Sequence, residues 1–226
     1  MRDTTGAGGA DPWIDYVYEL EHPEATVRQY EWRGIQRLVV HLCPLTAETQ
    51  WLDFGCGNGF YTLPMAKQVG PNGKVLAVDI QPEMIQMLKE RAANAGIDNI
   101  EPILSTEKET KLPENQVDLL ILVDVYHEFS FPSQMLAGIR KSLKDDGVVA
   151  LLEFRAEDPT VPIRPLHKMS KKQIMKEYEA NGFKLVREFD GLPWQHLMYF
   201  GRDNEWKKGK ASSAEKKAND EPNSDK

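Results

Sequence analysis

The stretch Trp51-Leu52-Asp53-Phe54-Gly55-Cys56-Gly57-Asn58-Gly59 has three glycines at every second position, directly after a short apolar run. We expect a β-strand up to Phe54, a turn through the glycines, and a helix that begins soon after Gly59. Glycine allows positive φ angles in such a turn, and its missing Cβ lets a ligand approach the backbone. A second apolar run, Val75 to Val78, ends at Asp79, twenty residues beyond Gly59. In doubly wound folds, an acid at the end of the second strand commonly holds a nucleoside ribose.

The spacing of the glycines distinguishes between nucleotide ligands. A dinucleotide fingerprint has the pattern G-x-G-x-x-G, which directs a helix N-terminus at a pyrophosphate. Here the pattern is G-x-G-x-G, and Asp53 stands two residues before the first glycine. This acid would repel a pyrophosphate, but it suits a ligand that carries an ammonium or a sulfonium group.

The stretch from Asp53 to Gly59, followed by Asp79, resembles the first two motifs of the class I S-adenosylmethionine-dependent methyltransferases. The resemblance extends over about residues 51–200. It implies S-adenosyl-L-methionine as the cofactor and S-adenosyl-L-homocysteine as its product. Asp79 is then expected to accept hydrogen bonds from both ribose hydroxyls. The residues expected to bind the cofactor are Asp53, Gly55, Gly57, Asn58, Gly59, Asp79, Ile80, Ser105, Thr106 and Asp124.

Structural interpretations compete with these assignments. The glycines can form a tight turn without a ligand, and Asp79 can cap the helix that begins near Pro82. Asp124 follows an otherwise apolar strand and is expected to meet an ammonium group of the cofactor or the acceptor, unless it too is only a cap. Many relatives place an acid after the third strand to receive the adenine amino group, whereas Ser105 and Thr106 stand there in this chain.

The composition is that of one folded domain with appendages. The chain has 226 residues, of which 41% are hydrophobic and 28% are charged. Its formal charge of -7 disfavours an extended phosphate-binding face, so we expect no nucleic-acid partner. Cys43 and Cys56 are the two cysteines and offer neither a disulfide framework nor a zinc quartet. Without a signal peptide or a bilayer-spanning apolar run, we expect a cytoplasmic monomer or homodimer with no membrane partner.

Apolar runs and helical patterns alternate along the chain. Strands are predicted at residues 51–54, 75–79, 100–104, 117–123, 148–154, 183–189 and 194–200, with a turn at residues 145–147. Helices are predicted to begin at Thr62, Pro82, Pro132 and Ser170, and Thr62 and Ser170 are suited to capping. The alternation indicates parallel strands with right-handed crossovers, whereas the short turn at residues 191–193 leaves room only for a hairpin. We therefore predict an α/β, Rossmann-like, doubly wound sheet of seven strands, mostly parallel, with a C-terminal antiparallel hairpin strand.

Three parts of the chain are expected. Residues 1–45 form an N-terminal extension whose helix, residues 23–42, either covers the cofactor and the acceptor or only shields a sheet edge. Residues 46–201 form the S-adenosylmethionine-binding methyltransferase domain. Residues 202–226 are rich in Lys, Ser, Glu, Asn and Asp, and we expect them to be a disordered polar tail.

The segment Val123-Asp124-Val125-Tyr126-His127-Glu128-Phe129 resembles the fourth-strand motif of small-molecule methyltransferases, including the branch related to ubiquinone and menaquinone biosynthesis. We expect Tyr126 and His127 to be catalytic residues that contact the acceptor. His127 is the candidate general base, because an imidazole titrates near neutral pH. Alternatively, His127 only braces its loop, since in-line methyl displacement does not always need a base.

Ligands of an open α/β sheet bind beyond the carboxyl ends of its parallel strands. The end of the fifth strand, the proline-punctuated loop after it and the last hairpin turn are expected at this edge. The candidate acceptor-binding residues there are Glu153, Arg155, His167, Gln195 and His196. No spacing of His, Cys, Asp and Glu in the sequence predicts a metal site.

Together these patterns favour an S-adenosylmethionine-dependent methyltransferase that moves a methyl group to a small-molecule acceptor by in-line displacement. Two alternatives stay open. A nicotinamide-dependent oxidoreductase would need a loop that tolerates phosphate. A non-catalytic S-adenosylmethionine-binding module would keep the cofactor pocket without acceptor chemistry, an alternative that the residues Tyr126 and His127 disfavour.

Overall fold

The computed structural model describes residues 49–192 and 194–207. The helix expected over residues 23–42 and most of the expected tail, residues 208–226, lie outside this described part of the chain. Among the helices that the structure describes, none has the length and apolar character that a membrane crossing requires.

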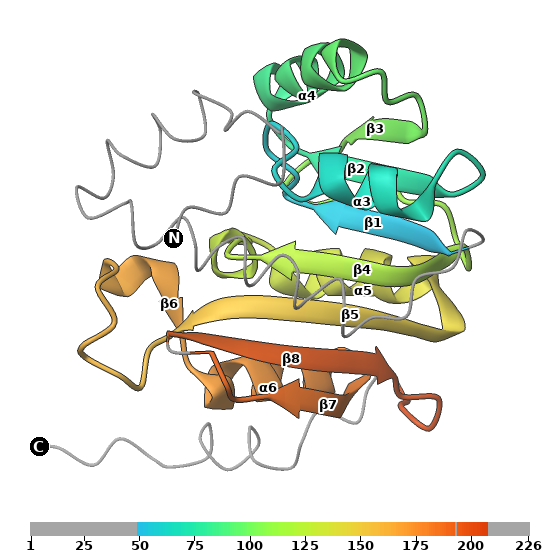
Figure 1. The fold of residues 1–226 in the computed structure, drawn as a ribbon. Coiled ribbons are helices and arrows are strands. Elements are labelled where there is room, and N and C mark those ends of the chain that lie inside the picture. The colour runs from blue at the N-terminus through green and yellow to red at the C-terminus, as the bar shows by residue number, and fades with distance from the viewer. Residues whose placement is uncertain (1–48, 193, 208–226) are drawn as a thin grey trace, which may run out of the picture. The chain divides into compact units, whose positions relative to one another are not determined.

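One mixed sheet forms the centre of the described part (Figure 1). Its strands follow the order β3-β2-β1-β4-β5-β8-β7, and a short β6 pairs with β5 outside this path. The strands are β1 Gln50–Phe54, β2 Lys74–Asp79, β3 Ile100–Leu104, β4 Val117–Val123, β5 Leu143–Arg155, β6 Lys168–Met169, β7 Phe183–Phe189 and β8 Gln195–Arg202. β1 to β5 pair in parallel, whereas β8 is antiparallel to both β5 and β7. The predicted doubly wound sheet with its antiparallel C-terminal hairpin is confirmed.

Two details of the sheet differ from the prediction of seven strands. The strand β6 adds an eighth, and its two residues are too few for periodicity to reveal. The predicted turn at residues 145–147 is part of β5 instead, and the pairing of β5 with β4 shifts register between Val117 and Leu119. Asp145, Asp146 and Gly147 lie in β5 between Leu143 and Val148, which pair with Val117 and Leu119, so the shift in register accommodates these three residues.

Helices cover both faces of the sheet. They are α3 Thr62–Val69, α4 Pro82–Asn94, α5 Pro132–Ser142 and α6 Lys171–Ala180, with short 3-10 helices η1 Tyr126–Glu128 and η2 Pro165–His167. Leu136 of α5 and Ile174 of α6 share one apolar cluster with Val78 of β2. Leu88 of α4 packs with Ala77, the preceding residue of β2. Because successive strand residues face opposite sides of a sheet, α4 lies on one face while α5 and α6 lie on the other.

The turn after β1 is packed tightly between its neighbours. The N–H groups of Gly55 and Cys56 both donate to the Val78 carbonyl, at 2.8 and 2.9 Å. Gly55 has a φ of 77°, and a Cβ built on it would lie 2.5 Å from a methyl of Val125. A side chain at this position would therefore meet both backbone strain and a steric clash.

The carboxyl group of Asp53 is buried beneath this turn. Asp53 is 3% exposed, and the Thr62 hydroxyl donates to its Oδ2 at 2.6 Å. Thr62 was predicted as a helix cap, and that prediction is wrong: Tyr61 is the cap residue of α3, and the Thr62 hydroxyl is used by Asp53. Burial raises the pKa of Asp53 to about 7, with the charge of Asp79 adding to this and the Thr62 hydrogen bond opposing it.

We expect Asp53→Asn to change how stability depends on pH. At pH values between the ordinary pKa of 3.8 and the folded pKa of about 7, Asp53 keeps its proton in the folded protein but has lost it in the unfolded chain. The wild-type free energy of unfolding should thus fall as pH rises, until the folded pKa is passed. Relative to wild type, the variant should gain about 2–3 kcal/mol between about pH 5 and about pH 8. Urea unfolding of both proteins at several pH values measures this, and parallel stability profiles would refute it.

Candidate functional site

A cavity of about 370 Å³ lies at the edge of the sheet where the parallel strands end. Its volume falls within the range of roughly 300–1,000 Å³ that small-molecule sites occupy. Phe54 ends β1, Asp79 ends β2 and Val123 ends β4, and all three line the cavity. The cavity is therefore where an open α/β sheet normally binds its ligand.

The described lining of the cavity is acidic. Four acidic side chains line it, whereas none of its described lining residues is a lysine, an arginine or a histidine. The four acids are Asp79, Glu107, Asp124 and Glu128. A pyrophosphate would meet these carboxylates without a compensating cation, whereas an ammonium or sulfonium group would be attracted.

Asp79 connects the glycine turn to the start of α4. Its Oδ2 accepts from the Gly57 N–H and its Oδ1 from the Gln81 N–H, each at 2.9 Å. Gln81 is the cap residue of α4, so Asp79 is not the cap itself. Each carboxylate oxygen retains acceptor capacity toward the cavity. Beside it, a Cβ built on Gly57 would meet nothing within 4 Å, so the glycine leaves open space at the cavity wall.

Asp124 places a carboxyl group at the cavity. Its φ of 50° lies in the left-handed region, and both of its carboxylate oxygens are buried with no partner among the described residues. Burial and the nearby charge of Glu153 raise the pKa of Asp124 well above its usual range, against a smaller effect of the Phe154 peptide group. Such a buried, unsatisfied carboxyl group is expensive and fits a ligand that brings a donor or a positive charge.

The other expected cofactor residues divide into two groups. Gly55, Ile80 and Thr106 line the cavity. Those absent from the lining are Asp53, Asn58, Gly59 and Ser105. Arg91 donates to both the carbonyl and the side-chain oxygen of Asn58, at 2.7 and 2.8 Å, and so braces the turn from α4.

Glu107 lines the cavity and was not among the predicted site residues. It stands three positions beyond the end of β3, one past Thr106. The family pattern predicts an acid directly after the strand, at the positions that Ser105 and Thr106 occupy here. Here Thr106 accepts from the Glu109 N–H at 3.0 Å, and this turn places Glu107 at the cavity. The apolar lining residues Met84, Phe129 and Met135 were also missed, because they lie in helices and a loop.

His127 is oriented by a buried carboxylate behind it. Glu153 of β5 is fully buried, and its Oε1 accepts from the N–H groups of Tyr126 and His127, at 2.7 and 3.2 Å. Its Oε2 lies 2.7 Å from His127 Nδ1. Because the carboxylate accepts, Nδ1 carries the proton, and Nε2 has the lone pair in the neutral ring. Burial lowers the pKa of His127, but the hydrogen bond and charge of Glu153 outweigh it, so the pKa is raised overall.

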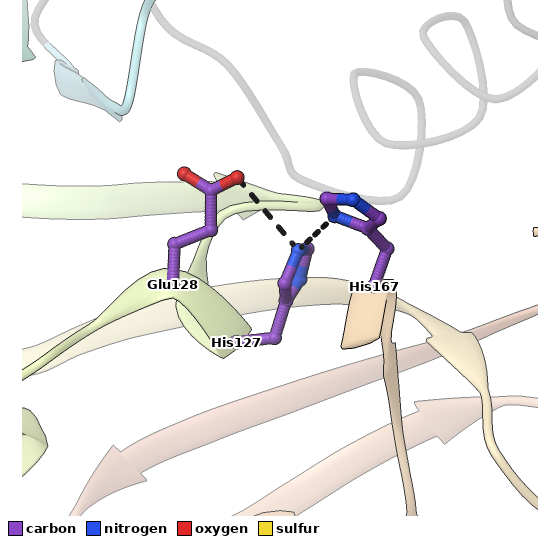
Figure 2. Close-up of side chains that lie close together, drawn as sticks. All are labelled: His127, Glu128 and His167. Carbon is purple, nitrogen blue, oxygen red and sulfur yellow. Dashed lines mark hydrogen bonds and ion pairs between the residues drawn. The ribbon is translucent and has the colours of Figure 1, made fainter. Parts of the chain in front are cut away.

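His167 and Glu128 lie next to Nε2, the other ring nitrogen of His127. His127 Nε2 lies 3.1 Å from His167 Nδ1 and 3.9 Å from Glu128 Oε1, and Figure 2 shows both side chains turned toward the His127 ring. The pairing of Lys168 in β6 with Phe154 in β5 brings His167 to this place. His127 and His167 are forty residues apart, so their proximity could not be predicted from spacing.

Tyr126, the other expected catalytic residue, packs in the core. It is 2% exposed, and its hydroxyl donates to Glu177 Oε2 of α6 at 2.6 Å. Its ring contacts those of Phe129 and Tyr178. Tyr126 is absent from the cavity lining, and its contacts fix η1 against the helical layer.

The remaining expected acceptor residues lie within the sheet. Arg155 ends β5, and its guanidinium donates to the carbonyls of Asp190, Leu192 and Gln195, so it holds the β7–β8 turn. Gln195 is 3% exposed and lies in β8. His196 is also buried and contacts Glu157 at 3.0 Å, and burial lowers its pKa although Glu157 opposes this. Of the five expected acceptor residues, His167 and Glu153 adjoin His127.

The chain is similar in sequence to known methyltransferases. A family model described as a methyltransferase domain matches residues 45–213. Demethylmenaquinone methyltransferase from Staphylococcus aureus is 24% identical over 156 residues, 69% of this chain and 63% of that protein. The chain thus spans less than two thirds of the length of these curated relatives. A SAM-dependent methyltransferase from Aquifex aeolicus has a TM-score of 0.68 at 27% identity, covering 73% of this chain and 88% of that one.

A more distant structure shares only the fold. The [4+2]-cyclase SpnF has a TM-score of 0.64 at 15% identity, covering 75% of this chain and 80% of that chain. Fold likeness at this distance says nothing of the reaction. The family model, by contrast, covers more than half of the chain, and it supports the predicted methyltransferase rather than a nicotinamide-dependent oxidoreductase. The chain belongs to the methyltransferase-domain family and has the fold of the class I S-adenosylmethionine-dependent methyltransferases.

Proposed function

We propose that this chain transfers the methyl group of S-adenosyl-L-methionine to a small-molecule acceptor. One observation carries the proposal: a cavity whose described lining includes four acids and no base lies against a glycine turn at the ends of β1 and β2. Such a cavity matches a cofactor with an ammonium and a sulfonium group and disfavours a dinucleotide. The family membership of the chain supports the same assignment.

The described residues fit this cofactor at each of its polar parts. Asp79 would accept from the ribose hydroxyls, and the open space at Gly57 would admit the methionine end of the cofactor. Asp124, a buried carboxyl group with no hydrogen-bond partner among the described residues, would meet the ammonium group. Thr106 and Glu107 follow β3 and line the cavity, where the family resemblance implies a contact with the adenine amino group, and a carboxylate at Glu107 would suit an amino donor.

When bound, the cofactor supplies a methyl group activated by the positive charge on sulfur. The chain's own contribution is to position the acceptor and to exclude water. Phe54, Phe129 and Met135 give the cavity an apolar wall, and in-line displacement gains from proximity in such a dry site. His127 would take the acceptor's proton through the nitrogen that Glu153 leaves free. Tyr126 acts as a positioning residue, since its hydroxyl is bound to Glu177.

A demethylated quinone is the first acceptor to test. The relative from Staphylococcus aureus is named a demethylmenaquinone methyltransferase, and a ring acceptor of this kind would suit the apolar wall. A non-catalytic binding module remains the alternative. It predicts cofactor binding without any methylated product, even from a metabolite extract incubated with labelled cofactor.

Asp79→Ala should weaken binding of S-adenosylhomocysteine by about 100-fold or more, because two hydrogen bonds to a charged group are lost. Isothermal titration calorimetry measures the affinity. Glu83→Ala is the matched control, since Glu83 is an exposed acid in the first turn of α4 and does not line the cavity. Equal affinity of Asp79→Ala and wild type would contradict the assignment. If NAD raised the melting temperature and S-adenosylhomocysteine did not, the assignment of S-adenosylmethionine as the cofactor would be wrong.

His127→Ala should leave the affinity for S-adenosylhomocysteine within about threefold of wild type and slow methyl transfer by about 100-fold or more. The reason is that His127 acts on the acceptor and does not line the cofactor cavity. Calorimetry gives the affinity, and single-turnover transfer from labelled cofactor gives the rate. Normal turnover by His127→Ala would show that the histidine only braces η1.

A further inference from the structure

We propose that His127, Glu128 and His167 bind a divalent transition-metal ion at the rim of the cofactor cavity. The site itself does not depend on the proposed function, whereas the role of the ion toward the acceptor does. Glu128 both lines the cavity and belongs to the three-residue group, so the ion would lie beside the bound cofactor.

The distances between the three side chains are those of ligands around one ion. The ligand atoms of His127, Glu128 and His167 all lie within 4.8 Å of one another. Metal–ligand bonds of about 2.0–2.2 Å place two ligands of the same ion roughly 3–4 Å apart. The separation of 3.1 Å between His127 Nε2 and His167 Nδ1 and that of 3.9 Å from His127 Nε2 to Glu128 Oε1 match this range. Rotation of the exposed Glu128 side chain closes the remaining gap.

The surroundings of His127 are those of a metal ligand. Metal-binding histidines usually donate their other ring N–H to a carboxylate, which fixes the tautomer and the ring orientation. Glu153 makes this contact with His127 Nδ1 at 2.7 Å, and two backbone N–H groups hold the carboxylate itself. The lone pair of Nε2 therefore points at His167 and Glu128 (Figure 2).

The donor set indicates the class of ion. Two imidazoles and one carboxylate suit Zn²⁺ and its first-row neighbours, whereas Mg²⁺ and Ca²⁺ prefer oxygen ligands. Three protein ligands leave a coordination position open, as in catalytic zinc sites. An acceptor oxygen or sulfur bound at this position would lose its proton to water more readily, because the ion stabilises the anion, and His127 would then be a ligand and not the base.

The ion and the general base make different demands on the chain. A base needs His127 and the Glu153 carboxylate, and His167 then has only a hydrogen-bonding role. An ion needs His167 and Glu128 as well, so replacing either of them should slow methyl transfer about as much as His127→Ala does.

The test measures metal binding directly on the full chain. After chelator treatment, wild type, His167→Ala and Glu128→Gln are titrated with Zn²⁺ by calorimetry and with Co²⁺ by visible absorption. Glu157→Gln is the matched control, because Glu157 is another partly exposed glutamate in contact with a histidine, His196, outside the cluster. Both replaced ligands are exposed residues, and circular dichroism melting curves check that each variant folds.

Wild type and Glu157→Gln should each bind one Zn²⁺. His167→Ala and Glu128→Gln should bind it about 100-fold more weakly or not at all. Equal binding by all four proteins would place the ion elsewhere and overturn the proposal, as would no binding by wild type. If one variant fails to fold, the other decides. The same proteins are titrated with S-adenosylhomocysteine in parallel. If wild type binds S-adenosylhomocysteine but does not bind Zn²⁺, only the ion site is refuted. If it binds Zn²⁺ but does not bind S-adenosylhomocysteine, only the proposed function is refuted.

Discussion

The buried carboxylate of Glu153 is the constraint on which the candidate site depends. It is fully buried in β5, and a buried charge is tolerable only when donors surround it. The donors are the backbone N–H groups of Tyr126 and His127 and the His127 ring. One side chain thereby fixes η1 and orients the imidazole, and its charge adds to the burial that raises the pKa of the neighbouring Asp124. Without the Glu153 carboxylate, η1 and the loop that follows β4 would lose these hydrogen bonds.

A second constraint is the number of acidic side chains around the glycine turn. Asp53 lies beneath the turn with a pKa of about 7, while Asp79 and Asp124 line the cavity, and no base is among the lining residues that the structure describes. Burial, with the charges of Asp79 and Glu153 adding to it, raises the pKa of Asp53 and of Asp124, so ionising these two acids is unfavourable in the free protein. A cationic ligand relieves the cost, so the arrangement favours binding over stability, as functional sites commonly do.

The sequence predicted the sheet well because its signals are local. Apolar runs gave the main strands, Pro82 and Pro132 are the first residues of α4 and α5, and Ser170 caps α6 by accepting from the Gln173 N–H. It predicted the site less well because side-chain partners are not local. Thr62 serves Asp53 rather than its own helix, Tyr126 turns into the core, and Arg155 holds a turn.

The sequence alone determined the doubly wound fold, the glycine turn and the position of Asp79, because period and spacing encode strands, helices and the edge where they end. Only the tertiary structure decided which polar groups meet. Glu153 and His127 come from adjacent strand ends, and the two-residue strand β6 carries His167 to them across forty residues. No sequence pattern specifies such a contact, since it arises from the register of β5 with β6 and the burial that this pairing imposes.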